Sequence, residues 1–522
     1  MQQELIISLI PSEADNDSVI KASIAEHLGI PDSSIAGFII LKKSIEARIK
    51  QPRMLLSVKA FINEPFYERI IQRIVLPNVG GAQKKVIIAG AGPAGLFAAL
   101  KLIEKGIRPI ILERGKDIRS RRRDLALLNK EGIINSDSNY CFGEGGAGTY
   151  SDGKLYTRSK KRGNVNRILN ILVQFGAEEN ILFDAHPHIG TNKLPSIITA
   201  IREQIIACGG EVLFGKKIDD LQLKNNAITG VKTSDGDLFQ GDAYILATGH
   251  SARDIFLLLQ DKKILIESKP FALGVRVEHP QQLIDTIQYH HAIRDAGLPP
   301  ASYSVVEQVN GRGAFSFCMC PGGIIATSST SPGELVVNGW SPSKRNNPFA
   351  NSGIVAAVEN SDIAPLIKKY GPLAAMYFQQ SVEQKAFEKG GGGFQAPAQR
   401  LVDFTNNKLS GSLPPCSYIP GVNTALMQEI LPSFIYTALQ TAFREFGKRM
   451  KGYFTNEAIV VAAESRTSSP VRIPRNPDTL SHPQIHNLYP CGEGAGYAGG
   501  IVSAAMDGEK VAEAISIYQH HN

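Results

Sequence analysis

The feature that most constrains this chain is a glycine-spaced turn between an apolar strand and a helix. Gly90, Gly92 and Gly95 form the pattern G-x-G-x-x-G directly after the apolar run KKVIIA. Gly90 permits a tight turn, Gly92 lets the backbone approach a diphosphate, and Gly95 lets the helix pack closely on the strand. The first helical residues, Pro93 and Ala94, then place the positive end of the helix toward the phosphate charge. The pattern therefore predicts a dinucleotide-binding turn.

An acidic residue at the end of the next strand supports this interpretation. The run RPIILE ends at Glu113, 23 residues after Gly90. At this position a carboxylate accepts hydrogen bonds from the hydroxyls of an adenosine ribose. The alternative is a glycine turn without a ligand, and a carboxylate at this spacing argues against it.

Two later segments favour FAD over NAD, since both cofactors present the same ADP moiety to such a turn. AYILATG, which ends at Gly249, has the form of the strand and turn that flavoproteins place over the cofactor. YPCGEGAGYAGGI places Glu493 between glycines, before a helix that follows Gly499. This carboxylate and the helix amides can hold the ribityl chain and second phosphate of FAD. We therefore predict non-covalently bound FAD. Because no second G-x-G-x-x-G follows a strand, we expect no separate nicotinamide-binding Rossmann domain.

The order of strand and helix patterns predicts an α/β protein with three units, in keeping with a length of 522 residues. Residues 1–78 are expected to form a small N-terminal α/β domain. Residues 83–268 and 456–522 are expected to form a Rossmann-like FAD-binding domain. Residues 269–455 are expected to form an inserted α+β domain that receives the substrate.

Composition and charge indicate the surroundings of the chain. The start MQQELIISLI lacks a basic signal-peptide region and no apolar run approaches bilayer length, so we expect a cytoplasmic protein without membrane contact. Six scattered cysteines are expected to be free thiols. The net charge is +7, and the basic runs RSRRRD from Arg119 and SKKRG from Ser159 are interpreted as solvated faces. Without interleaved aromatic residues, nucleic-acid binding is not expected.

Several longer motifs together resemble a known family. They are FGEGGAGTYSDGKL, PHIGTNKL, ATGHSARD, GVRVEHP, GFQAPAQR, ESRTSSPVRIPR and CGEGAGYAGGIVSAAMDG, and they cover most of the chain. The chain resembles the uncharacterised bacterial FAD-dependent dehydrogenases, also called NAD(P)/FAD-dependent oxidoreductases. The resemblance implies a glutathione-reductase-like FAD domain of the kind shared with aromatic hydroxylases. The FAD contacts expected from the motifs and the resemblance are Gly90, Gly92, Pro93, Ala94, Gly95, Glu113, Arg114, Gly145, Gly146, Ala147, Gly148, Ile218, Thr248, Gly249, Gly492, Glu493, Gly499, Gly500 and Ile501.

Three polar residues are candidates for chemistry beside the flavin, which itself carries the hydride. His250 follows the ATG turn, and either contacts cofactor or substrate or belongs to a capped helix start. Lys154 follows a glycine-rich loop and supplies positive charge, unless that loop is purely structural. Arg466 either stabilises charge on the reduced flavin or only bridges the two domains.

Histidine and cysteine pairs suggest metal or redox chemistry at first sight. His186 and His188 are separated by a proline and have no carboxylate cluster nearby, so we expect no metal site. Cys318 and Cys320 lie two apart on an expected strand, which points both thiols to one face but is awkward for a disulfide between them. Buried free thiols are expected there and at Cys491, with a redox relay as the alternative.

Together these features predict an FAD-dependent oxidoreductase that transfers a hydride between a small-molecule substrate and flavin. An unidentified electron partner completes the cycle, and NADH or NADPH is a candidate as a diffusible donor. One alternative is a flavin monooxygenase. Another is a flavin-containing RNA-associated or scaffold protein that docks through its small N-terminal domain and basic patches.

Overall fold

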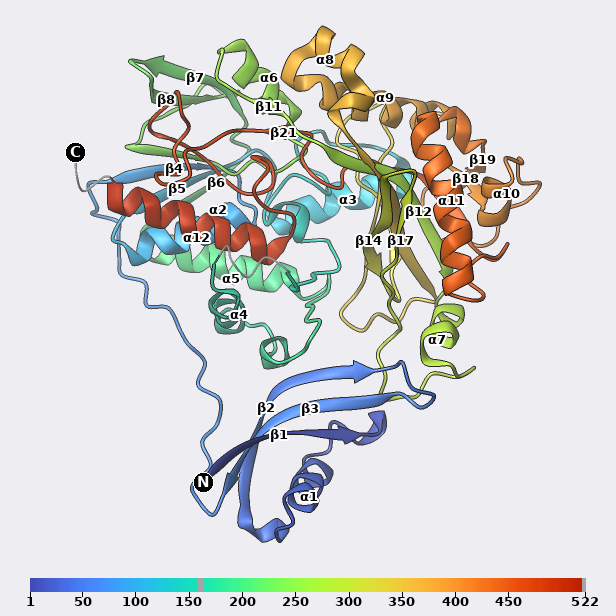
Figure 1. Ribbon diagram of the computed structural model, residues 1–522. Helices are drawn as coiled ribbons and strands as arrows, with labels where there is room; N and C mark the ends of the chain where they lie inside the picture. The colour runs from blue at the N-terminus through green and yellow to red at the C-terminus, as the bar shows by residue number, and fades with distance from the viewer. Residues whose placement is uncertain (158–162, 519–522) are drawn as a thin grey trace.

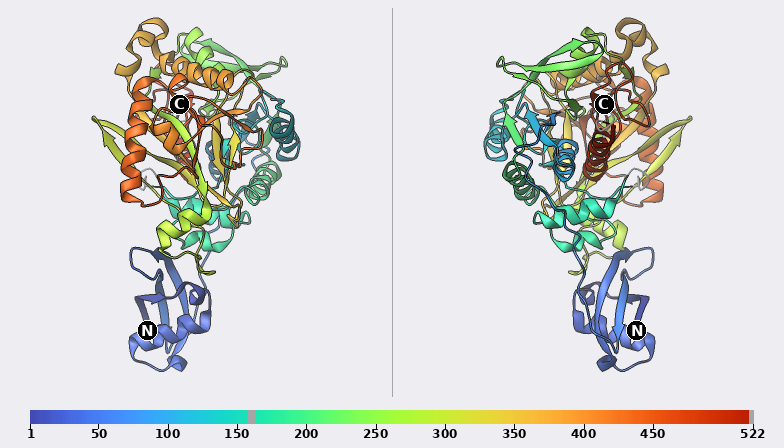
Figure 2. Two further views of the ribbon diagram at one scale, coloured as in Figure 1. Left: turned by 90° about the vertical axis from the view of Figure 1, so that its right-hand side faces the viewer. Right: turned by 90° about the vertical axis from the view of Figure 1, so that its left-hand side faces the viewer.

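Three units form the molecule, and the computed structural model describes residues 1–157 and 163–518. The small N-terminal unit lies at one end, and the two larger units lie side by side above it (Figure 1). Views from both sides show the same separation (Figure 2). Most of the basic run from Ser159 lies outside the described residues.

The N-terminal unit is a three-stranded antiparallel sheet with one helix packed on it. Its elements are β1 (Gln2–Leu9), α1 (Asp17–Leu28), β2 (Ile35–Glu46) and β3 (Arg53–Ile62), and the strand order is β1-β3-β2. Alternate residues of β1 and β3 are buried, as expected for strands with one face against a core. That core lies under α1, with Ile24 and Val58 among its fully buried residues.

A long extended segment links this unit to the rest, which changes the first expected boundary. The small sheet ends at Ile62, well before residue 78, and residues 63–84 form no helix or strand. The segment is nevertheless held in place, because Gln72 and Ile74 donate backbone N–H groups to side chains of helix α4 (Val165–Gln174). Backbone groups outside a sheet need such partners when they pack against a domain.

The second unit is built on a five-stranded parallel sheet in the order β22-β10-β4-β5-β6. The strands are β4 (Lys85–Ala89), β5 (Arg108–Glu113), β6 (Glu211–Phe214), β10 (Ala243–Leu246) and β22 (Leu488–Pro490). β22 comes from the C-terminal segment and pairs with β10. The chain therefore leaves this domain and returns to it.

Both faces of the parallel sheet are covered, which explains the continuous apolar runs of its strands. In β4, Val86 and Ile88 face a layer of helices, whereas Ile87 and Ala89 face the opposite layer. The helical layer contains α2 (Pro93–Glu104), α4, α5 (Leu194–Ala207) and α12 (Ile501–Tyr518). The other layer contains the antiparallel strands β7 (Ile218–Lys224), β8 (Ala227–Thr233) and β9 (Leu238–Phe239) and helix α6 (Arg253–Asp261). Helix α3 (Ile118–Glu131) follows β5.

The third unit is a seven-stranded sheet with helices on its outer side (Figure 1). The strand order is β13-β14-β17-β12-β20-β18-β19, and only β18 and β19 pair in parallel. The strands are β12 (Phe271–Pro280), β13 (Val306–Val309), β14 (Arg312–Cys320), β17 (Phe349–Val358), β18 (Ala396–Arg400), β19 (Val422–Thr424) and β20 (Ile459–Glu464). Its helices are α7 (Gln281–Tyr289), α8 (Ala364–Tyr370), α9 (Ala374–Lys389), α10 (Leu401–Thr405) and α11 (Ser433–Arg449).

Two small sheets complete the strands. They are the pair β15 (Ile324–Thr327) and β16 (Val337–Trp340), and the pair β11 (Glu267–Ser268) and β21 (Val471–Arg472). β11 and β21 lie where the chain passes between the two larger units.

The expected boundary at residue 456 lies too early. Strand β20 pairs with β12 on one side and β18 on the other, so it is an interior strand of the third unit. All six of its residues are buried. Pairing on both edges and burial on both faces bind this segment to the third unit, and the chain returns to the parallel sheet only after it.

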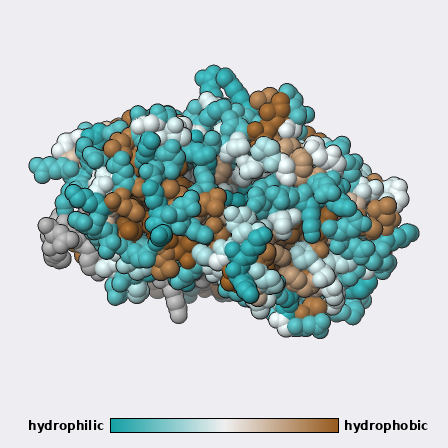
Figure 3. Space-filling view, turned by 90° about the horizontal axis from the view of Figure 1, so that it is seen from above, coloured by the Kyte–Doolittle hydropathy of each residue, from teal (hydrophilic) through white to brown (hydrophobic). Residues whose placement is uncertain are grey.

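The face of the molecule opposite the small unit is mostly hydrophilic. Hydrophilic side chains cover most of the face opposite the small unit, and hydrophobic ones appear in several separate groups (Figure 3). None of the helices in the described residues combines the length and apolar character needed to span a bilayer.

Candidate functional site

A cavity of about 380 Å³ lies where the parallel sheet meets the third unit. It begins beyond the carboxyl ends of β4, β5 and β10, the edge at which open α/β sheets bind ligands. The predicted FAD contacts that line it are Gly90, Gly92, Pro93, Ala94, Glu113, Arg114, Gly146, Ala147, Gly148, Ile218, Thr248, Gly249, Glu493, Gly499, Gly500 and Ile501. The candidates His250, Lys154 and Arg466 line the same cavity.

The glycine turn has the geometry that its spacing predicted. Gly90 has φ +104°, and a Cβ atom there would lie 2.5 Å from the carbonyl oxygen of Ala247. A Cβ at Gly95 would lie 2.0 Å from the carbonyl oxygen of Gly90, so Gly95 lies outside the lining but sets the turn. Helix α2 begins after Gly92, whose position has no capping side chain. The first turn of α2 is therefore available to an anion.

Glu113 holds the walls of the cavity together. It is only 4% exposed, and its carboxylate accepts backbone N–H groups from Ala91, Gly115 and Gly143, each at 2.9 Å. The glycine turn and the loop after α3 are thus fixed on one side chain. Its contact with a ribose stays a prediction, which its place in the lining supports.

A buried arginine shapes the loop after α3. Arg121 is fully buried and donates to the carbonyl oxygens of Asn139, Tyr140, Glu144 and Gly146 at 2.7 to 3.0 Å. The basic run from Arg119 is therefore only partly a solvated face. The signal was present in the sequence, because Arg121 shares helical spacing with the buried residues Asp124, Leu125 and Leu128.

Two other predicted contacts shape the walls without lining the cavity. Gly145 has φ +78° and turns the loop that Arg121 holds. Gly492 has φ +74° and donates its N–H to the carboxylate of Asp507 at 2.8 Å. Both glycines support residues that do line the cavity.

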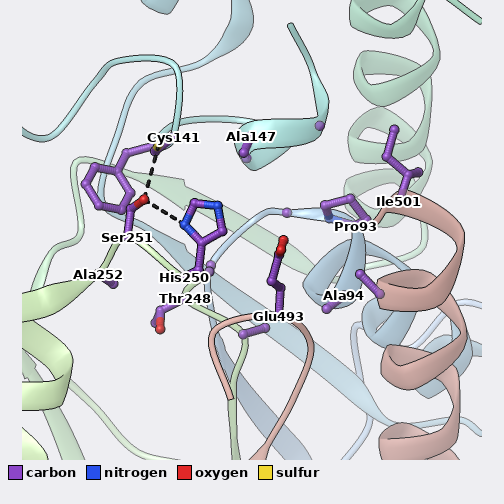
Figure 4. Close-up of a pocket in the computed structure, with 18 of the residues that line it drawn as sticks. Pro93, Ala94, Cys141, Ala147, Thr248, His250, Ser251, Ala252, Glu493 and Ile501 are labelled. Atoms are coloured by element: carbon purple, nitrogen blue, oxygen red, sulfur yellow. Dashed lines mark hydrogen bonds between the residues drawn. The ribbon is translucent and has the colours of Figure 1, made fainter. Parts of the chain in front are cut away.

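The C-terminal segment brings a second helix start and a carboxylate to the same space. The lining includes Gly499, Gly500 and Ile501 at the start of α12. Glu493 points into the pocket, beside His250 and the first turn of α2 (Figure 4). Its carboxylate makes no hydrogen bond or ion pair with any described residue, and burial raises its pKa to about 7. An unpartnered carboxylate facing a cavity fits the hydroxyl groups of a ribityl chain.

Positive side chains gather at the end of the cavity near Ile218. The guanidinium of Arg114 lies 4.2 Å from the centre of the Phe142 ring and is paired with Asp137 and Asp254. Lys216 and Lys217 also line this end, and the sequence interpretation missed them. The only sequence feature that could have identified these two lysines is their position next to the predicted contact Ile218.

His250 lies at the centre of a short hydrogen-bond chain (Figure 4). Its Nδ1 lies 2.8 Å from the Ser251 hydroxyl, which donates to the Sγ of Cys141 at 3.3 Å. Because the Ser251 proton goes to Cys141, Nδ1 of His250 carries a proton and Nε2 is left as an acceptor. Burial and the nearby Arg466 lower the pKa of His250 to about 4, so the ring is neutral at physiological pH.

Arg466 is already fully occupied by protein partners. Its guanidinium donates to Glu383 at 2.9 and 3.0 Å and to the hydroxyls of Ser251 and Thr330. Glu383 and Thr330 belong to the third unit and Ser251 to the second. This geometry favours the bridging role over stabilisation of flavin charge.

Of the remaining residues of interest, some line the cavity and others make only structural contacts. Lys154 has its Nζ 3.6 Å from Asp152 and 3.8 Å from the Sγ of Cys318. His188 contacts the carbonyl oxygen of Ser343, and the described residues contain no cluster of three His, Cys, Asp or Glu side chains suited to a metal ion. Phe317 and Asn338 of the third unit line the cavity, and only long-range packing places them there.

Family models and a relative place this chain among known proteins. Residues 270–467 match the model described as FAD-dependent protein, C-terminal domain-like, and residues 83–127 match an FAD binding domain. A protein of Clostridium beijerinckii described as uncharacterised is 38% identical over 520 residues, which is 96% of each chain. The chain belongs to an uncharacterised family of FAD-dependent proteins.

Membership of this FAD-dependent family confirms the resemblance seen in the motifs and the α/β fold with an FAD-binding domain. The 270–467 match ends after β20, in agreement with the strand pairing of the third unit. Residues 1–61 match a domain of unknown function, DUF8436, which ends with the small sheet.

Three solved structures match this chain at low similarity. L-proline dehydrogenase from P. horikoshii is 14% identical with a TM-score of 0.33, and the match covers 85% of this chain and 95% of that one. PqsL of P. aeruginosa in complex with 2-aminobenzoylacetate is 11% identical with a TM-score of 0.34, with 84% and 87% covered. CtdE in complex with FAD is 9% identical with a TM-score of 0.31, with 83% and 84% covered. With TM-scores this low, these likenesses carry no argument about the reaction.

Proposed function

We propose that this protein is an FAD-dependent oxidoreductase whose small-molecule substrate enters between the second and third units. The observation that carries the proposal is that the starts of α2 and α12 and the unpartnered carboxylate of Glu493 line a single cavity. Bound FAD would accept or donate a hydride there. The third unit contributes Phe317, Cys318 and Asn338 to the lining and so provides a wall for a substrate.

The residues of the cavity have separate tasks in this proposal. Backbone groups at the first turn of α2 bind the diphosphate. Glu493 accepts hydrogen bonds from the ribityl hydroxyls. Glu113 keeps the glycine turn in place and accepts from the ribose with its remaining lone pairs.

His250 is the residue that we assign to proton movement. Its neutral ring has Nδ1 fixed by Ser251, and Figure 4 shows the ring within the pocket. Nε2 is therefore able to take a proton from a substrate that loses a hydride, or to return one in the reverse direction.

An absorbance spectrum of the purified protein tests the cofactor. We expect the flavin spectrum in the isolated protein, or tight binding of FAD after it is added. The oxidoreductase proposal is then tested by anaerobic mixing with NADH, NADPH and a panel of metabolites, with bleaching of the flavin absorbance as the readout. A protein that stays colourless and does not bind added FAD would contradict the proposal at its first step.

A second experiment separates two classes of flavin reaction. A dehydrogenase or reductase transfers reducing equivalents without putting oxygen into its substrate. A monooxygenase incorporates an atom of dioxygen, so a substrate found in the anaerobic screen is turned over under labelled dioxygen and its mass is measured. We expect no label in the product.

A further inference from the structure

Cys318 and Cys320 lie where strand β14 stops following its neighbour. The register between β14 and β17 shifts between Phe317 and Cys320, and Cys318 has φ +48°. This left-handed backbone is unusual for a residue with a side chain. In a regular strand residues two apart share a face. Here the bulge breaks that regular pattern: Cys318 lines the flavin cavity, and Cys320 is fully buried and does not line it.

Two cations lie beside the thiols. The Nζ of Lys154 is 3.8 Å from the Sγ of Cys318. The guanidinium of Arg276 donates to the carbonyl oxygen of Cys318 at 2.6 Å and lies 3.6 Å from the Sγ of Cys320. Two carboxylates belong to the same cluster: Asp152 pairs with Arg345 at 2.7 Å and lies 3.6 Å from Lys154, and Glu464 pairs with Arg276 at 2.7 Å. The cations Lys154, Arg276 and Arg345 outnumber these two carboxylates. The local charge therefore favours a thiolate.

The acid–base properties of the pair follow from these contacts. A hydrogen bond from the Cys320 thiol and the charges of Lys154 and Arg276 hold the pKa of Cys318 well below its usual value, against the effect of burial. By contrast, burial raises the pKa of the Cys416 and Cys491 thiols. Cys318 thus has the environment of a reactive cysteine, whereas Cys416 and Cys491 have that of inert ones.

The Cys320 thiol is also within hydrogen-bonding reach of the Cys318 sulfur. The Sγ of Cys320 is 3.3 Å from the carbonyl oxygen of Cys318. Residues two apart in a strand have Cα atoms about 6.6 Å apart, which lies within the range for disulfides. Cys318 leaves the regular strand conformation, so the expectation from a regular strand that such a bond is awkward does not apply here.

We propose that Cys318 and Cys320 are a redox-active thiol pair of the flavin cavity, in which Cys318 faces the cofactor and Lys154 stabilises its thiolate. The inference rests on the proposed function, since it takes oxidised FAD as the electron acceptor. Oxidation of the pair forms the S–S bond and breaks the S–H bond of Cys320. Two electrons and the released proton pass to the flavin, which leaves a disulfide and reduced flavin anion. The reverse step returns the pair to thiolate and thiol.

The first experiment measures thiol reactivity on the chain without flavin. The protein is treated with iodoacetamide at a series of pH values, and the alkylated cysteines are quantified by mass spectrometry. We expect Cys318 to react fastest and to keep its rate at a pH where ordinary thiols are protonated. Lys154→Met should slow alkylation of Cys318 about tenfold near neutral pH, because a cation is lost beside the thiolate. Lys130→Met on the surface of α3 is the matched control and should change nothing.

The second experiment counts electrons in the flavin-loaded protein. Anaerobic titration of the oxidised protein with dithionite should consume about twice the reducing equivalents in the wild type as in Cys318→Ser or Cys320→Ser, because a disulfide takes two electrons in addition to the flavin. Cys416→Ser, outside the cavity, should behave like the wild type. Equal consumption of reducing equivalents in all four proteins with flavin bound would overturn the proposed redox-active thiol pair and leave the oxidoreductase proposal standing.

Failure to bind flavin would instead count against the proposed function. The thiol pair is then tested by oxidising the flavin-free chain with diamide and mapping its peptides. A Cys318–Cys320 disulfide that forms before other cysteines are modified supports the pair. Alkylation of Cys318 no faster than that of Cys141, with no effect of Lys154→Met, would overturn the inference in either state of the protein.

Discussion

Two carboxylates in one cavity show how position decides the task of a residue. Glu113 accepts three backbone N–H groups, whereas Glu493 has no hydrogen-bond or ion-pair partner among the described residues. Burying such a group without a partner costs free energy that a ligand can return. Glu113 is thus chiefly a structural residue with a free lone pair, and Glu493 is the carboxylate poised for a ligand.

The first prediction concerns Glu493. Above its raised pKa of about 7, where Glu493 is ionised, Glu493→Gln should weaken FAD binding about tenfold or more. Hydrogen bonds to a charged group contribute about 1.5–3 kcal/mol, and the amide keeps only a neutral acceptor. Quenching of FAD fluorescence on titration of flavin-free protein measures the change. Glu457→Gln, on the exposed surface of the third unit, is the control. Equal dissociation constants for both variants and the wild type would show that Glu493 does not touch the cofactor.

Local spacing made some of these residues predictable and left others ambiguous. The glycine turn and Glu113 lie within one βαβ unit, so their geometry follows from short-range pattern. The role of Arg466 had two interpretations in the sequence, because its partners Glu383 and Thr330 are far away along the chain. Only the folded structure decides between them.

At the scale of elements, the site depends on two helices packed against each other. α2 and α12 start at the same cavity, and both contribute their first residues to its lining. The two helices pack tightly at Gly508, where a Cβ atom would lie 2.1 Å from the carbonyl oxygen of Ala94. That carbonyl belongs to the first turn of α2. The packing of the helices therefore sets the distance between the two phosphate-facing ends.

The second prediction follows from this contact. Gly508→Ala should lower the free energy of unfolding by about 1–3 kcal/mol, because overpacking forces the two backbones apart. It should also weaken FAD binding, because the first turn of α2 moves with Ala94. Thermal unfolding and fluorescence titration measure the two effects. Gly411→Ala is the control, since a Cβ there meets no atom within 4 Å. Wild-type stability and affinity in Gly508→Ala would refute the packing argument.

Elements were predictable where a regular period holds and not where it breaks. The strands of the small unit and the βαβ turn follow their sequence periods. Strand period also predicted that Cys318 and Cys320 share a face, and the bulge in β14 overrides it. A bulge is selected by the pairing of two distant strands, and pairing of that kind has no local signal.

At the scale of the whole molecule, the sequence predicted the order of the three units better than their edges. The return of the C-terminal segment to the parallel sheet was readable from its glycine turn and helix. The sequence of strand β20 does not indicate which sheet the strand joins, because an apolar run of six residues fits either of the two larger units. Its partners β12 and β18 lie far away in sequence and decide its membership.

The stability of the third unit should depend on pH through a buried histidine outside the flavin site. His279 is fully buried in β12, its Nε2 contacts the carbonyl oxygen of Tyr453 at 2.9 Å, and its Nδ1 has no partner among the described residues. Burial lowers its pKa to about 4 from an ordinary value of 6.5. Below the ordinary value the unfolded chain therefore binds a proton that the folded chain refuses, so this histidine destabilises the fold progressively as the pH falls.

The third prediction uses His279→Gln, which keeps a donor to Tyr453 but cannot be protonated. Between about pH 7.5 and about pH 5 the wild type should lose about 2 kcal/mol of unfolding free energy relative to the variant. The single tryptophan of the chain, Trp340, lies in the third unit, so urea unfolding followed by its fluorescence reports on this unit. Other titrating groups act equally in both proteins and cancel in the difference. A difference that is flat across this pH range would mean that His279 takes up its proton as readily in the fold as in the unfolded chain, so that its burial does not control the pH response.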